Sequence, residues 1–430
     1  MQASASMPSG SVVHSDYVSS VEALAVLAVK PQTLYSYVSR GMIRRICVDG
    51  KTSLYNRKDI SRLKARSTAR SGHGAVAGGA LQWGEPVLVT GITEITENGP
   101  RYREYLALDL ARKGYSYESV AEYLWTTEGI NPSIQWCSDG SIFRIAPQVA
   151  ALTGAYPSIH LRQLLTEIVL LLCIEHSQHH RESQIEPSLT PARALIQALC
   201  IAFGFVGPRR RFVAPGENES IASYILRAFG VDANRSQIGV LNAVLVLLVD
   251  HEFSPATFAA RIAASSGVDL HSCIGAALHV HFGSALGLRC DRVEQALQAA
   301  SSAHGQAGRS SLINVCPVGF SHPLYADGDP RANEILKLAL SLTEHAAVSR
   351  EALQTLRRID NHQGAVSLDA ALVVLCRALG LNGPVAGGLL AVSRSAGWIA
   401  HVIEQYKQDF MIRPRGKFTS TGMAADQSAA

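Results

Sequence analysis

Helical periodicity dominates the chain from Leu108 onward, where apolar residues recur at spacings that place them on one face of a helix. Alanine and leucine are the main apolar residues, and the alternation of β-branched residues that is typical of strands is scarce. With 430 residues, of which 47% are hydrophobic and 17% charged, the chain can form more than one hydrophobic core. The sequence therefore predicts an all-α protein of two or three domains.

A short non-helical segment precedes this helical part. Residues 91–96 have the composition of a strand, and Glu97-Asn98-Gly99 is a turn of the type that joins two antiparallel strands. We therefore expect one β-hairpin at the entrance of the helical part.

Residues 16–66 predict a small separate domain. Ser19 and Glu22 have the spacing of a helix N-cap and its capping-box partner, and Pro31 suits the first position of a second helix. Residues 43–55 would form two strands around a tight turn. Two short helices followed by such a β-wing are typical of a winged helix-turn-helix.

This domain resembles the MerR type of helix-turn-helix in its core, Thr33-Leu34-Tyr35-x-Tyr37-Val38-x-x-Gly41-Met42-Ile43. The resemblance implies contacts with the DNA major groove and backbone by Gln32, Thr33, Tyr35, Ser36, Arg40 and Lys51. Charge agrees with a polyanionic partner, because residues 1–82 hold 11 Lys/Arg against 4 Asp/Glu, whereas the remainder holds 28 against 31. A docking or dimerisation module without DNA contact is the alternative.

Three segments have no periodic pattern, and we interpret them as a disordered tail (1–15), a flexible Ser/Gly/Ala-rich linker (67–82) and a second tail (419–430). No basic start followed by an apolar core opens the chain, so we expect no signal peptide. The eight cysteines are scattered without a Cys-x-x-Cys pair, which favours the reducing cytoplasm over a disulfide framework. The apolar run 168–174 is too short to span a bilayer, so we expect no membrane contact.

Two segments of the helical part place a histidine close to arginine. One is His251-Glu252-x-x-x-Ala256-Thr257-Phe258-x-x-Arg261, and the other is Gly319-Phe320-Ser321-His322-x-x-Tyr325, which Asp329-Pro330-Arg331 follows. Guanidinium groups bind carboxylates through paired hydrogen bonds, and a histidine can donate to a carbonyl oxygen. These residues therefore suit a small dicarboxylate, although either histidine taken alone could be structural.

Both segments resemble those of the citrate synthase family, and the resemblance covers roughly residues 83–418 in the family's order. Residues 84–125 are similar to the family's opening, and residues 393–415 are similar to its close. The resemblance implies a dimer in which each subunit has a cleft between two helical domains. These would be a large domain, 83–288 with 382–418, and a small domain, 289–381.

The resemblance also implies what individual residues do. Citrate synthases condense the acetyl group of acetyl-CoA with oxaloacetate and release CoA, without a further cofactor. Asp369 matches the aspartate that removes a methyl proton, and His322 matches the histidine that donates to the oxaloacetate carbonyl. The residues that match the oxaloacetate-binding positions are His251, Arg331, Arg394 and Arg413. The last of these, in the family, reaches into the neighbouring subunit's site.

The sequence departs from the family in the part of the site that would hold the thioester. The family's Gly-Pro-Leu-His-Gly-Gly-Ala-Asn is replaced by residues 283–290, in which Leu286 stands where the family has the histidine that stabilises the enol. Loss of one such donor typically lowers the rate by about 100- to 1,000-fold. The family's Gly-His-Arg becomes Ser321-His322-Pro323, and its Asn-Val-Asp becomes Ser367-Leu368-Asp369.

Structural alternatives remain for the matched residues. Asp369 could cap the helix that follows it, Arg394 could form an ion pair between helices, and residues 413–415 could be a basic surface patch. A cluster of three histidines shares one helix face, at His176, His179 and His180. No second ligand cluster accompanies it, and we expect no metal site.

Three functions are compatible with these residues. The first is an acyltransferase that condenses acetyl-CoA or another short acyl-CoA with oxaloacetate as a homodimer, at a rate that Leu286 would impair. The second is a catalytically silent sensor that binds DNA through residues 16–66. The third is a non-catalytic chain that forms a heterodimer with an intact citrate synthase-like paralogue and provides Arg413 to that partner's site.

Overall fold

The computed structural model describes residues 17–27, 29–39, 43–48, 52–57, 59–60, 88–138, 140–179, 189–283, 288–302, 325, 328–342, 346–360 and 365–414. The chain separates into two compact units. One is an N-terminal unit, residues 1–89 with 415–430, and the other is a helical unit, Thr90–Pro414. Of the residues singled out in the sequence, those outside the described ranges include Arg40, Lys51, His180, Leu286 and His322.

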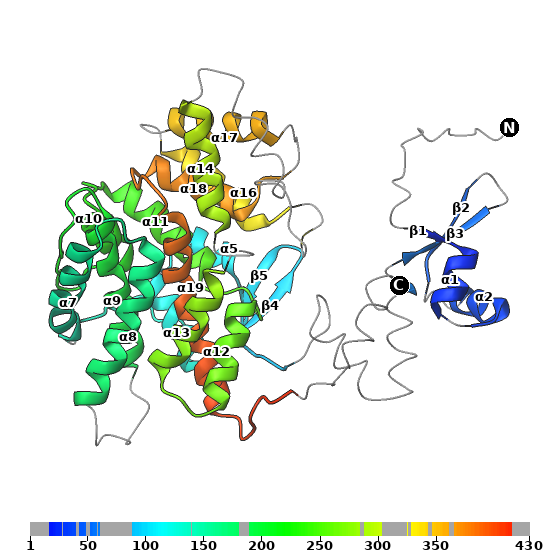
Figure 1. Cartoon of the computed structure of the whole chain (residues 1–430), viewed down its shortest axis with the longest axis horizontal. Coiled ribbons are helices and arrows are strands. Elements are labelled where there is room, and N and C mark those ends of the chain that lie inside the picture. Colours follow the sequence, from blue (N-terminus) through cyan, green and yellow to red (C-terminus); the bar gives the residue numbers. More distant parts are fainter. Residues whose placement is uncertain are drawn as a thin grey trace. The chain divides into compact units, whose positions relative to one another are not determined.

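The N-terminal unit contains, in its described part, two helices and a three-stranded antiparallel sheet in the order β1-β3-β2. The elements are β1 (Tyr17–Ser19), α1 (Ser20–Leu27), α2 (Pro31–Ser39), β2 (Arg45–Val48) and β3 (Thr52–Asn56) (Figure 1). The backbone N of Ser19 donates to Glu22 Oε2 over 3.0 Å, and the backbone N of Glu22 donates to Ser19 Oγ over 3.2 Å. The predicted capping box is therefore confirmed, as is the start of the second helix at Pro31. That this unit is a winged helix-turn-helix stays a prediction.

The helical unit begins with the predicted hairpin, which is confirmed. Strands β4 (Thr93–Thr96), β5 (Gly99–Tyr102) and β6 (Tyr105–Leu106) form an antiparallel sheet in that order. Gly99 has a φ of +101°, a value that glycine adopts readily, so a glycine suits the turn. Tyr102 at the end of β5 is fully buried, and its hydroxyl donates to the carbonyl of Leu247 over 3.0 Å. The hairpin is thereby attached to the helix that leads to His251.

The rest of the unit is helical, as the periodicity predicts. Its helices are α5 (Ala107–Arg112), α6 (Tyr117–Thr126), α7 (Ser141–Ala155), α8 (Leu161–His179), α9 (Thr190–Val206), α10 (Ile221–Phe229), α11 (Arg235–Leu248), α12 (Pro255–Ser265), α13 (Leu270–His281), α14 (Arg289–Ser302), α16 (Pro330–Ser341), α17 (Ala346–Asp360), α18 (Leu368–Ala378) and α19 (Ala386–Tyr406). Among the described helices, none is long and apolar enough to cross a membrane.

Helix α19 passes through the middle of the helical unit and is buried along most of its length (Figure 1). It packs against α6, α9, α11, α12 and α13, and also against α14 and α18. The last two belong to a group formed by α14, α16, α17 and α18. Side chains on α19 can therefore meet residues from segments that are far apart in the sequence. The boundary between a large and a small domain within this unit stays a prediction.

A glycine on α19 brings that helix against the end of α11. The backbone N of Gly397 donates to the carbonyl of Val249 over 3.2 Å. A Cβ atom at Gly397 would lie 2.4 Å from that oxygen and 2.5 Å from Oδ1 of Asp250, which is closer than real Cβ contacts allow. The absence of a side chain at Gly397 therefore lets the segment that carries His251 lie directly on the helix that carries Arg394.

Candidate active site

His251 lies in a tight turn between α11 and α12. The turn contains Glu252, whose φ of +55° lies in the left-handed region and costs of order 1 kcal/mol for a residue other than glycine. Two hydrogen bonds hold it, from the backbone N of Glu252 to Oδ2 of Asp250 over 3.0 Å and from that of Thr257 to the N-cap Ser254 over 3.2 Å. The half-buried ring of His251 has its Nε2 3.0 Å from the hydroxyl of Tyr325.

Arg331 is held at the N-terminus of α16 by the N-cap residue Asp329. Its Nε donates to Oδ1 of Asp329 over 3.0 Å, and its Nη2 donates to Oδ2 over 2.6 Å. Both side chains are at most 1% exposed. Burial alone would lower the pKa of Arg331, but the carboxylate of Asp329 raises it well above its usual value. The Nη1 of Arg331 is buried without a hydrogen-bond partner among the described residues, so it is available to a ligand.

Arg394 lies on α19, and its Nε donates to the backbone carbonyl of Leu248 over 3.0 Å. Burial lowers the pKa of this guanidinium, the charge of Asp250 opposes that effect, and the charge of Arg331 lowers the pKa further. Asp250 is paired with His401, and Asp329 is paired with Arg331. In the part of the chain that the structure describes, Arg394 therefore has no carboxylate bonded to it, and the two neighbouring guanidinium groups suit an anion.

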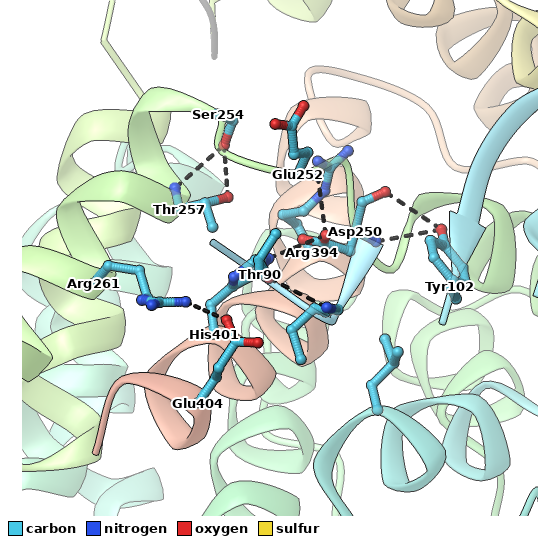
Figure 2. Close-up of polar contacts among 12 residues, drawn as sticks. Thr90, Tyr102, Asp250, Glu252, Ser254, Thr257, Arg261, Arg394, His401 and Glu404 are labelled. Atoms are coloured by element: carbon cyan, nitrogen blue, oxygen red, sulfur yellow. Dashed lines mark hydrogen bonds and ion pairs between the residues drawn. The ribbon is translucent and has the colours of Figure 1, made fainter. Parts of the chain in front are cut away.

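Asp250, just after the end of α11, is paired with His401 within α19. Oδ2 of Asp250 is 3.3 Å from Nε2 of His401, and neither side chain is exposed. Figure 2 shows Asp250 close to Arg394 and Tyr102, with Arg261 and Glu404 paired further along α19. The pKa of Asp250, which burial would raise, is held below its usual value by His401. The pair fixes the turn that presents His251.

Asp369 is the second residue of α18. The N-cap is Ser367, whose Oγ accepts from the backbone N of Ala370 over 3.2 Å, so the alternative that Asp369 caps this helix is wrong. The carboxylate of Asp369 is 16% exposed; its Oδ2 lies 3.9 Å from Nε of Arg289, and its Oδ1 lies 3.6 Å from Sγ of Cys290. Burial raises the pKa of Asp369, while the charge of Arg289 lowers it. The charge of Arg331 also lowers this pKa, which places Asp369 within electrostatic reach of Arg331.

Arg413 belongs to the segment that follows α19. It is exposed, and its neighbour Ile412 donates its backbone N to Oγ of Ser265 at the end of α12 over 3.0 Å. No contact within the described ranges joins Arg413 to His251, Arg331, Arg394 or Asp369. Of the six enzyme-site residues predicted from the sequence, the structure thus groups these four and places Arg413 apart, and His322 lies outside the described part.

For the histidine cluster of α8 the sequence predicted no metal site; of this cluster, His180 lies outside the described residues. His176 lies near His271, with ring centroids 5.2 Å apart, and His271 is paired with Asp269. Over the described residues, no group of three or more His, Cys, Asp or Glu side chains is arranged to hold a metal ion.

A buried histidine near Arg394 was not among the site residues predicted from the sequence. His281 at the end of α13 is buried, and burial together with the charge of Arg394 lowers its pKa to about 3, so it is neutral at physiological pH. Its Nε2 has no hydrogen-bond partner among the described residues. The sequence does not predict this position, because helical periodicity does not show that Arg394, from a distant helix, lies near His281.

Buried guanidinium groups next to a histidine, a tyrosine and a carboxylate at a helix N-terminus define a site of the kind that enzymes use for small carboxylate substrates. The model of the citrate synthase C-terminal domain matches residues 80–415. The chain therefore belongs to the citrate synthase family.

Individual relatives agree with this assignment. The chain is 26% identical to citrate synthase 2 of Bacillus subtilis over 277 residues, which are 63% of this chain and 74% of the relative. It is 29% identical to the citrate synthase of Saccharolobus solfataricus over 218 residues, which are 47% of this chain and 58% of the relative. It is also 28% identical to the 2-methylcitrate synthase of Shewanella oneidensis, over 57% of this chain and 66% of the relative.

Solved structures show the same fold. The citrate synthase of Thermoplasma acidophilum, in a ternary complex with carboxymethyl coenzyme A and oxaloacetate, has a TM-score of 0.63 at 20% identity and covers 80% of this chain and 96% of its own. The citrate synthase of Thermotoga maritima has a TM-score of 0.57 at 21% identity, over 78% of this chain and 94% of its own.

Proposed function

We propose that the chain binds oxaloacetate and condenses it with acetyl-CoA or another short acyl-CoA, after which water hydrolyses the thioester of the product and releases CoA. The observation that carries this proposal is the buried pair of Arg331 and Arg394, which lies beside His251 and within electrostatic reach of Asp369. An acyltransferase of this type needs a dicarboxylate held firmly next to a base, and these residues supply both parts.

The arginines would hold the two carboxylates of oxaloacetate. Nη1 of Arg331 is buried and has no partner among the described residues, and Arg394 is bonded to a backbone carbonyl through Nε alone in the hydrogen bonds described. The carboxylates of the substrate would accept charge-assisted hydrogen bonds from the remaining N–H donors of both guanidinium groups. His251, oriented by Tyr325, would contact the same substrate, and His322, as its match to the family implies, would donate to the keto oxygen.

Asp369 would act as the base on the acyl-CoA. Burial raises its pKa, so its carboxylate is a stronger base than an ordinary aspartate. It would remove a proton from the methyl group of the thioester, and the resulting nucleophilic carbon would attack the keto carbon of oxaloacetate.

A complete site would also require a second subunit. Arg413 is exposed, and within the described residues of one chain it does not approach the arginine pair. A dimer in which each chain provides Arg413 to the other would bring a third cation to the substrate.

The proposal is tested by calorimetry and by thiol release with purified protein. Oxaloacetate should bind, and Arg394→Gln should weaken its binding by about tenfold to 100-fold, because a hydrogen bond to a charged group contributes about 1.5–3 kcal/mol. Arg350→Gln, which changes an exposed arginine on α17, is the matched control and should bind normally. Acetyl-CoA or propionyl-CoA should release thiol only when oxaloacetate is present. Absence of both oxaloacetate binding and thiol release would refute the proposal.

A second candidate function concerns the N-terminal unit. On α2, Gln32 is exposed and the large side chain of Tyr35 is 57% exposed, whereas Thr33 and Ser36 are half-buried. An exposed tyrosine and glutamine on one short helix, in a part of the chain with a net positive charge, suit contact with a nucleic acid. DNA binding by this unit, regulated by oxaloacetate in the helical unit, would make the protein a sensor.

Fluorescence anisotropy with DNA from upstream of the coding sequence tests this second function. The affinity should fall steeply with salt, and Tyr35→Ala should lower it by about tenfold or more. Val26→Ala on α1 is the control, because it also shortens an exposed apolar side chain of the same unit. Binding that is absent, or that does not change with salt, would leave the unit as a docking module.

A further inference from the structure

The first residue of α14 places an arginine next to the candidate base. Nε of Arg289 lies 3.9 Å from Oδ2 of Asp369, and among the described residues this is the one ion pair of Arg289. The guanidinium side chain is 40% exposed and the carboxylate is 16% exposed, so the guanidinium is the more accessible half of the pair. Among the described residues, neither Nη group of Arg289 has a hydrogen-bond partner, so both can reach another oxygen.

The proposed reaction needs a donor at this place. When a methyl proton leaves the thioester, negative charge develops on the thioester oxygen, and a carboxylate base cannot remove so weak an acid unless that charge is stabilised in the same step. The side chain of Leu286 has no hydrogen-bond donor that could do this. The arginines at positions 331 and 394 would be bonded to the carboxylates of oxaloacetate. A guanidinium beside the base is therefore the described group best suited to the developing charge.

We infer that Arg289 stabilises the enolate oxygen of the acyl thioester, an inference that rests on the proposed condensation. The carboxylate of Asp369 takes the methyl proton, the C–H electron pair forms the carbon–carbon double bond, and the π pair of the carbonyl moves to the oxygen. The Nη groups of Arg289 donate to that oxygen. The enolate carbon then attacks the keto carbon of oxaloacetate.

Charge is balanced at each stage of this step. Before proton transfer, the guanidinium of Arg289 is paired with the carboxylate of Asp369. After it, the carboxyl group is neutral and the enolate carries the negative charge. The guanidinium thus has one anionic partner throughout, and the change of partner requires a change of hydrogen bonds rather than a movement of the chain.

Cys290 has a different role in this arrangement. Its Sγ lies 3.6 Å from Oδ1 of Asp369, and burial raises the pKa of the thiol well above its usual value, so it remains protonated and can donate. Cys290 therefore positions the carboxylate from one side, while Arg289 contacts its other oxygen.

The alternative is that Arg289 only stabilises the ionised form of Asp369. The two roles predict different results for Arg289→Gln. In both, loss of the positive charge raises the pKa of Asp369, so the acidic limb of the rate profile moves to higher pH. If Arg289 acts only in this way, the rate on the high-pH plateau is retained. With the enolate-stabilising role, the plateau itself falls, by about 100- to 1,000-fold.

The experiment measures binding as well as turnover. With oxaloacetate saturating, calorimetry compares carboxymethyl-CoA, which carries a carboxylate on the carbon bonded to sulfur, with CoA, which lacks that group. Arg289→Gln should weaken carboxymethyl-CoA binding by about tenfold to 100-fold and leave CoA binding unchanged. Arg289→Lys should restore part of the affinity because it keeps the charge. Arg292→Gln, on the same helix, is the control.

The outcomes separate this inference from the proposed function. If the unchanged protein prefers carboxymethyl-CoA to CoA and the preference requires Arg289, Arg289 is the group that binds the anion next to Asp369. If the protein then releases no thiol with any acyl-CoA, the proposed condensation is refuted, and the enolate step with it. Equal binding of the two compounds by the unchanged protein, or full carboxymethyl-CoA affinity in Arg289→Gln with a retained plateau rate, would overturn the inference. Circular dichroism and the Tm of each variant verify that it is folded.

Discussion

Asp369→Asn is expected to lower kcat for thiol release by about 100- to 10,000-fold, the range for loss of a positioned general base. The amide has the shape of the carboxylate but cannot accept a proton. Because burial already raises the pKa of Asp369 and so favours its neutral form, a neutral amide should be tolerated in the fold. The affinity for oxaloacetate should stay within a few-fold of its original value. Steady-state kinetics and calorimetry on the same preparation measure both quantities.

Asp409→Asn is the matched control, because it makes the same chemical change at an exposed aspartate. It should leave kcat unchanged. Turnover by Asp369→Asn that equals that of the control would mean that another residue removes the proton.

Arg331→Met is expected to lower the free energy of unfolding by about 3–5 kcal/mol, because it removes the guanidinium that neutralises the buried carboxylate of Asp329. The same change should remove the stabilisation that oxaloacetate provides, since Arg331 is proposed to bind it. Urea denaturation with and without oxaloacetate measures both effects.

Two comparisons make this second prediction specific. The double variant Asp329→Asn/Arg331→Met should regain much of the lost stability, because no buried charge remains unpaired. Arg101→Met removes one half of the exposed ion pair with Glu94 and should cost only about 0–1 kcal/mol. Equal losses for Arg331→Met and Arg101→Met would contradict the burial of the Arg331 pair.

Local features of the fold could be predicted because each depends on residues close in the sequence. The capping box of Ser19 and Glu22 is formed as expected, α2 begins at Pro31, and the chain turns at Gly99 between β4 and β5. A cap or a tight turn is decided by the side chain and backbone of about four residues, so its pattern is visible without the rest of the molecule.

Predictions about single residues of the site were less complete. Asp369 was left as either a base or a helix cap, and only the hydrogen bond of Ser367 excludes the cap. Arg394 was left as either a substrate ligand or an ion-pair partner, and the structure shows its Nε on the carbonyl of Leu248. Both questions concern which of several possible partners lies nearest, and residue type alone does not decide that.

The sequence by itself determined the helical class, the local caps and turns, and the family, because hydrophobic period and motif order are properties of the chain. Only the tertiary structure decided which distant side chains meet. Asp250 pairs with His401, and Arg289 lies beside Asp369. These contacts depend on how helices cross, which is set by close packing such as that of Gly397 on Val249, and no local pattern encodes it.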